Sequence, residues 1–280
     1  MITTLKLWFS SIATTFTNIG ALIVFAIVYL MLLLASYFFI STREATVAQV
    51  FVTYALMIVI PALFFIYQAA IIDRVRDGKF RWRAIVLDAV RFFLATIPLL
   101  LIAWLLYYLL NKLAVRYPAP AISLLPATQG PPKPAALHWP SLIFASLKFV
   151  LLGVALPLAA IHLWVEVASC NLRESLRGGA KLIVSRLGRR FACAFGSESV
   201  LIYALGLFFF FVLPYTVLFV PFTPKGNKTD FAVFILRLLL TYIFSFIGWV
   251  VTVSALAGVN PEPPAPAAAV AIAQPVEAAA

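Results

Sequence analysis

Long runs without a charged side chain alternate with short basic segments along this chain. Five runs lack any acid or base, and they cover residues 7–42, 45–72, 92–111, 199–224 and 238–261. A sixth run, 134–165, contains a single lysine, Lys148. A helix needs about 20 apolar residues to cross the hydrocarbon core of a bilayer, and each run is long enough to do so. The pattern therefore predicts an all-α membrane protein, a polytopic bundle of six transmembrane helices.

The expected spans cover residues 19–40, 47–72, 89–110, 142–165, 200–220 and 231–256. Four spans contain an internal proline, namely Pro61, Pro98, Pro157 and Pro214. Each proline bends its helix, because the ring removes one backbone hydrogen bond and clashes with the preceding turn. The bends act either as hinges or as fixed features that set the shape of the bundle. Close approach between helices is expected at Gly20, Gly153, Gly206 and Gly248.

The flanking segments differ in character from the bundle, which we place at residues 18–258. Residues 1–17 have one apolar helical face, made of Leu5, Trp8, Phe9, Ile12 and Phe16, with Lys6 and four hydroxyl residues on the other side. This segment is either an interfacial amphipathic helix, which we favour, or the first turns of span one. The proline-rich outer loop 117–140 is expected to be extended, and the Ala/Pro-rich tail 259–280 to be disordered.

The charge distribution predicts an orientation. Only 11% of the residues are charged and 64% are apolar, with a mean hydropathy of +1.05 and a net charge of +11. The N-terminus and the linkers 73–91 and 167–194 together have thirteen lysines and arginines, against six on the opposite side. Because cytoplasmic loops are enriched in these residues, we expect both termini in the cytoplasm and a multi-pass protein of the bacterial inner membrane.

The basic linkers also indicate a partner. Their positive residues flank apolar spans and do not cover a soluble domain, which favours anionic lipid headgroups over nucleic acid. Expected inner-leaflet contacts are Arg74, Arg76, Lys79, Arg81, Arg83, Lys181, Arg186, Arg189 and Arg190. Other membrane subunits are a second class of partner.

Two cations fall inside expected spans. Lys148 and Arg237 lie in the outer halves of spans four and six, where a buried positive charge is unfavourable. They snorkel to the surface, contact another subunit, or together form a site for an anion or a lipid phosphate.

Catalytic and metal-binding motifs are missing from the sequence. His162 and Glu166 lie four residues apart on one helix face, which is half of a metal site or a polar pair facing the bundle. A zinc protease motif needs a second histidine at fixed spacing, and no Gly-x-Ser-x-Gly motif is present. We therefore expect no catalytic residue, no metal and no cofactor.

The two basic linkers share a local pattern. Arg76-Asp77-Gly78-Lys79 aligns with Arg177-Gly178-Gly179-Ala180-Lys181, and each precedes a basic amphipathic stretch, as in a two-helix repeat. With the interfacial N-terminus and six spans, this arrangement resembles bacterial six-helix membrane proteins. That group includes the membrane domain attached to glycerophosphodiester phosphodiesterases. The resemblance implies the bundle fold, but it assigns no functional residue and no phosphodiesterase activity.

Three hypotheses of function follow. The favoured one is a non-catalytic integral membrane protein, acting as an accessory subunit, a scaffold or a lipid-associated bundle. The alternative is a permease or channel for a small anion or lipid, with Lys148 and Arg237 along the route. The third is an intramembrane enzyme that uses His162, Glu166 or Glu198.

Overall fold

A computed structural model gives an all-helical protein and describes residues 2–43, 45–118, 138–169, 179–221 and 226–259. Six long apolar helices account for the six expected spans, so the chain is a polytopic membrane protein. They are α2 (Ile19–Ser41), α3 (Val47–Asp77), α4 (Trp82–Ala114), α5–η1–α6 (Trp139–Ser169), α9–η2–α10 (Ser197–Phe219) and α11 (Asn227–Gly258). Each is longer than its expected span, because a helix keeps its own backbone hydrogen bonds after it leaves the apolar layer.

Among the described residues, two further helices lie outside the spans: α1 (Ile2–Thr17) and α8 (Gly179–Ala194). Asn18 separates α1 from α2, and its side chain accepts a hydrogen bond from the Ala21 amide at 2.9 Å. This is an N-cap, so α1 is a helix in its own right. Most of the loop 117–140 and all but one residue of the tail 259–280 lie outside the described residues.

Local signals also explain the ends of α3. Thr46 and Gln49 form a capping box at its start. Gly78 ends it with a φ of 69°, a left-handed conformation that glycine adopts without strain. The chain then enters α4 after a short turn, whereas the second basic linker contains the separate helix α8. The two linkers therefore differ in length and in secondary structure.

Spans four and five each contain a short π-helix before a proline. These are η1 (Phe149–Ala155), which precedes Pro157, and η2 (Phe208–Val212), which precedes Pro214. Pro157 cannot donate a hydrogen bond to the carbonyl of Gly153, four residues earlier. The hydroxyl of Tyr203, on the neighbouring span, donates to that carbonyl oxygen at 3.1 Å. An adjacent helix thus satisfies the backbone group that the proline leaves free.

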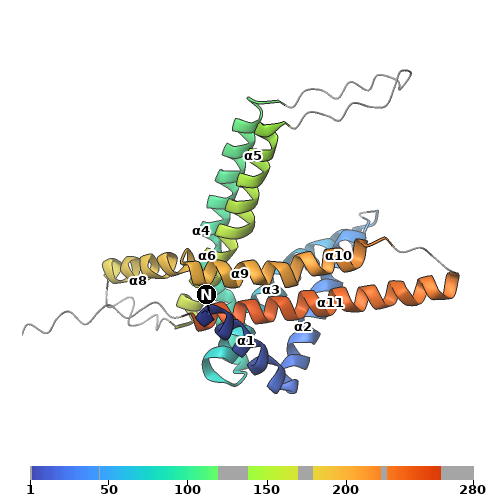
Figure 1. The fold of residues 1–280 in the computed structure, drawn as a ribbon, viewed down its shortest axis with the longest axis horizontal. Helices are drawn as coiled ribbons and strands as arrows, with labels where there is room; N and C mark the ends of the chain where they lie inside the picture. The colour runs from blue at the N-terminus through green and yellow to red at the C-terminus, as the bar shows by residue number, and fades with distance from the viewer. Residues whose placement is uncertain (1, 44, 119–137, 170–178, 222–225, 260–280) are drawn as a thin grey trace, which may run out of the picture.

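The packed core lies in one half of the bundle. Consecutive buried residues occur at 67–73 in α3 and at 250–256 in α11, so other helices surround both segments. We call this half the basic end. It contains the turn between α3 and α4, the end of α6, helix α8, the start of α9 and the end of α11. Toward the opposite end the helices diverge, and the pair α4–α5 extends away from the pair α10–α11 (Figure 1). Apolar side chains on these diverging parts are largely exposed, as expected for surfaces that contact lipid.

Candidate functional site

At the turn between α3 and α4, acidic side chains are bound by arginines. The Asp73 carboxylate is 1% exposed and accepts from Arg76 Nη2 at 3.1 Å and from Arg81 Nη2 at 3.2 Å. It also accepts from the main-chain N–H of Arg81 at 3.1 Å, and Arg81 pairs with Asp77 as well. The hydrogen bond to Asp73 raises the pKa of the Arg81 guanidinium. Arg76 also donates to the carbonyl oxygen of Ala168, so these contacts attach the turn to the end of α6.

Arg190 connects three helices. Its Nε donates to Glu166 Oε2 at 2.9 Å, and its Nη1 donates to the carbonyl oxygen of Val259 at 3.0 Å. The residue is 8% exposed, which corrects its assignment to the headgroup surface. The Arg190 side chain points from α8 toward the core, where it contacts Glu166 on α6 and Val259 at the end of α11.

His162 has a different partner from Glu166. His162 Nε2 lies 3.1 Å from Ser199 Oγ on α9, and both side chains are buried. Both residues face the bundle from one side of the helix, and their side chains contact different elements. Among the described residues, no group of three metal-ligating side chains comes together.

The remaining predicted headgroup residues are distributed over the basic end. Lys79, Arg83 and Arg189 are exposed, and Arg74 is half-buried in a pocket. The side chains of Lys181 and Arg186 lie outside the described part of α8.

Lys148 and Arg237 occupy separate places. Lys148 Nζ donates to Asn111 Oδ1 at 2.5 Å and lies 5.6 Å from the centre of the Tyr107 ring, both on α4. Arg237 Nη1 lies 3.4 Å from the carbonyl oxygen of Leu218, one residue before the end of α10. Lys148 thus contacts α4, and Arg237 contacts α10, the neighbouring helix in each case. These contacts lie on different helix pairs and do not bring the two cations into one site.

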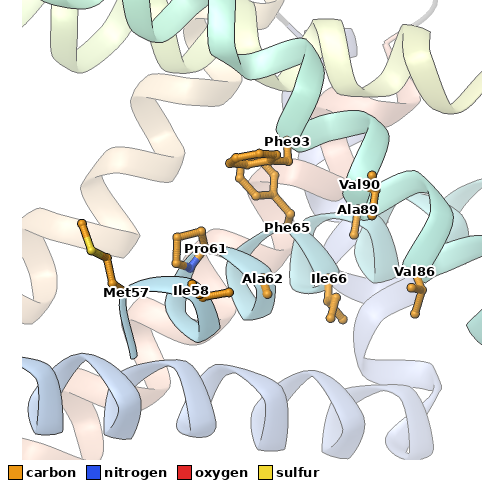
Figure 2. A pocket seen from close by; sticks show the side chains of 10 residues that line it. All are labelled: Met57, Ile58, Pro61, Ala62, Phe65, Ile66, Val86, Ala89, Val90 and Phe93. Atoms are coloured by element: carbon orange, nitrogen blue, oxygen red, sulfur yellow. The ribbon is translucent and has the colours of Figure 1, made fainter. Parts of the chain in front are cut away.

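An apolar pocket opens where α3 meets α4, around Pro61 (Figure 2). Its volume is about 430 Å³. All ten lining residues are apolar: Met57, Ile58, Pro61, Ala62, Phe65, Ile66, Val86, Ala89, Val90 and Phe93. Such a surface fits hydrocarbon and offers nothing to orient a polar substrate.

A second pocket, of about 270 Å³, lies at the basic end between α1, α2, α3 and α11. We call it the hydroxyl pocket, because Ser10, Ser11, Thr14, Thr15 and Ser254 all line it. Arg74 contributes a positive charge to the same pocket. Among the described pockets, this one combines a cation with a cluster of hydroxyl groups.

Sequence reasoning missed two features of this end. The ion pairs had a signal in the sequence, because each acid lies three or four residues before an arginine. The pairs are Asp73–Arg76, Asp77–Arg81 and Asp88–Arg91. Hydroxyls recurring at positions 10, 11, 14 and 15 were a signal for a polar face of α1. Nothing in the sequence connected Ser254, on the last span, to that face.

The chain was compared with known proteins at three levels. No protein-family model, no curated protein and no solved structure matches it.

Proposed function

We propose that this chain is a non-catalytic, lipid-associated integral membrane protein whose basic end contacts anionic headgroups at the cytoplasmic face of a bacterial inner membrane. The observation that carries the proposal is the surplus of exposed positive charge at that end. Three exposed cations form this surplus. Lys79 lies in the turn after α3, Arg83 in the first turn of α4, and Arg189 on α8.

Three of the described acids at this end are bound by arginines other than Arg83 and Arg189. Asp73 and Asp77 pair with Arg76 and Arg81, and Glu166 pairs with Arg190. Each lysine or arginine near an anionic leaflet contributes about 1 kcal/mol of attraction. The basic end is thus built as an electrostatic surface on a membrane-embedded core.

The arrangement of the core supports the non-catalytic part of the proposal. His162 and Ser199, the residues that most resemble part of a catalytic site, contact each other inside the packed bundle. Catalysis requires such groups to meet a substrate in a shared pocket. Their burial fits a role in joining α6 to α9.

The test is the lipid composition retained by the purified protein. The full chain is extracted with its surrounding lipid, and mass spectrometry measures the enrichment of anionic over zwitterionic lipid relative to the parent membrane. Replacing Lys79, Arg83 and Arg189 together by glutamine is expected to reduce this enrichment severalfold, because each of the three positions loses about 1 kcal/mol of attraction for an anionic headgroup.

A matched control removes three exposed charges from the opposite end, through Lys112→Gln, Arg116→Gln and Lys228→Gln. This variant is expected to retain the enrichment. Equal losses in both variants, or no enrichment in the unmodified chain, would contradict the proposal.

A further inference from the structure

The hydroxyl pocket has two chemically different walls. On α1, each of the four hydroxyl groups donates to a main-chain carbonyl of the same helix, over 2.7–2.9 Å. A hydroxyl group has one hydrogen to donate and two lone pairs. Because the four hydroxyl hydrogens are already donated to carbonyl groups, the α1 wall presents oxygen atoms that can accept hydrogen bonds.

The α3 wall provides a cation. Arg74 is half-buried, with its guanidinium carbon 5.8 Å from the centre of the Phe80 ring. The adjacent acids Asp73 and Asp77 are paired with Arg76 and Arg81. The start of α2, at Asn18 and Ala21, also lines the pocket and adds the positive end of a long helix.

The same pocket contains the ends of α3 and α11, at Gly78 and Gly258. The carbonyl ends of helices attract positive charge. The pocket thus combines a site for an anion with acceptors for a donor-bearing cation. A zwitterionic ligand with both groups is complementary to it.

The position of the pocket indicates that the ligand comes from the membrane. Helix α1 turns Trp8 into the core, where its ring lies 5.0 Å from that of Phe209, while Phe9 and Phe16 are 60% and 45% exposed. Exposed phenylalanines on an amphipathic helix are typical of insertion at the bilayer surface. The hydroxyl groups therefore face a cavity beside the headgroup layer.

The size of the cavity limits what enters it. A volume of about 270 Å³ is below the range of about 300–1,000 Å³ typical of sites for drug-sized molecules. It accommodates a headgroup and leaves the acyl chains in the bilayer.

We infer that the hydroxyl pocket binds the headgroup of a phospholipid with a phosphodiester and a primary ammonium group, as in phosphatidylethanolamine. The phosphate contacts Arg74, and the ammonium group donates to the hydroxyl oxygens of α1. This inference rests on the proposed lipid association and adds a headgroup selectivity that net charge alone does not provide.

The experiment is native mass spectrometry of the full chain in detergent, titrated with short-chain phosphatidylethanolamine and with short-chain phosphatidylcholine. Both lipids are zwitterionic phosphodiesters, but the quaternary ammonium of the second has no N–H donor. We expect the ethanolamine lipid to bind about tenfold more tightly, the size of one hydrogen bond to a charged group. Equal binding of the two lipids would overturn the inference.

Two variants test the contributions of the α3 wall and of the α1 wall separately. Arg74→Gln is expected to weaken the binding of both lipids by about tenfold, because a charged phosphate contact is lost. Ser11→Ala combined with Thr15→Val is expected to remove the preference for ethanolamine and to preserve the binding of the choline lipid. Arg116→Gln removes the same charge from the opposite end and does not line the pocket, so it is expected to keep both the affinity and the preference. If Arg74→Gln keeps the affinity as Arg116→Gln does, the inference fails.

A water-soluble competitor identifies the source of the ligand without any variant. O-Phosphoethanolamine contains the same charged groups and no acyl chains, so it is expected to compete more weakly than the short-chain lipid. Equally strong competition would overturn the assignment to a membrane lipid and indicate a soluble phosphate ester. Loss of the preference alone, with anionic lipids still enriched, would reject this pocket and leave the proposed function standing.

Discussion

Two glycines determine how closely span five and α11 approach each other. A Cβ atom added to Gly248 would lie 2.8 Å from the amide nitrogen of Phe210, and one added to Gly206 would collide with the side chain of Thr252. By contrast, an added Cβ at Gly20 or Gly153 meets only ordinary contacts. The sequence predicted close approach at all four glycines, and only the packing shows that Gly206 and Gly248 are the two that require it.

Gly248→Ala is therefore expected to destabilise the bundle by about 1–3 kcal/mol, the usual cost of overpacking. The obstacle is backbone of span five, which cannot rotate away as a side chain can. Unfolding of the full chain in mixed detergent micelles measures the effect.

Gly188→Ala is the matched control, since no atom lies within 4 Å of the added methyl group. Because alanine favours helix over glycine by about 1 kcal/mol, this variant is expected to be neutral or stabilising. Equal destabilisation by the two substitutions would contradict the close-approach argument.

Among the helices, α8 is joined to α6 by a largely buried ion pair. Glu166 and Arg190 are 14% and 10% exposed in their side chains, and Arg190 also binds the end of α11. Removing one partner of a buried pair leaves a charge without compensation, at a cost of about 3–5 kcal/mol. Glu166→Gln and Arg190→Gln are each expected to destabilise the protein by an amount near the lower end of that range.

A double-mutant cycle checks this prediction. The double variant is expected to be less destabilised than the sum of the two single variants, because the contact between the two side chains can be lost only once. Glu198→Gln, at an exposed glutamate at the start of α9, serves as the control and is expected to have little effect. Additive losses in the cycle would show that the pair does not hold α8.

For the whole molecule, the proposed orientation can be tested with single cysteines. Lys79 lies at the basic end and Arg116 at the opposite end, and both are exposed. In a chain whose two native cysteines are replaced by serine, Arg116→Cys is expected to react with a membrane-impermeant maleimide in intact cells. Lys79→Cys is expected to react only after lysis, because the more basic loops stay in the cytoplasm. The reverse labelling pattern would invert the topology.

The number and position of the spans followed from the sequence, because the thickness of the bilayer requires about 20 apolar residues in each helix. The separate α1, the basic linkers and the glycines near span five were also visible as patterns. Helical periodicity assigns a residue to a face of its own helix and does not say which helix packs there.

Only the tertiary structure could therefore assign partners. It pairs Glu166 with Arg190 and His162 with Ser199, it places Lys148 and Arg237 against different neighbours, and it closes α1, α2, α3 and α11 around one pocket. These contacts join residues that are separated in the chain, so they depend on how the helices pack against one another. The apolar runs predict the helices but not this packing.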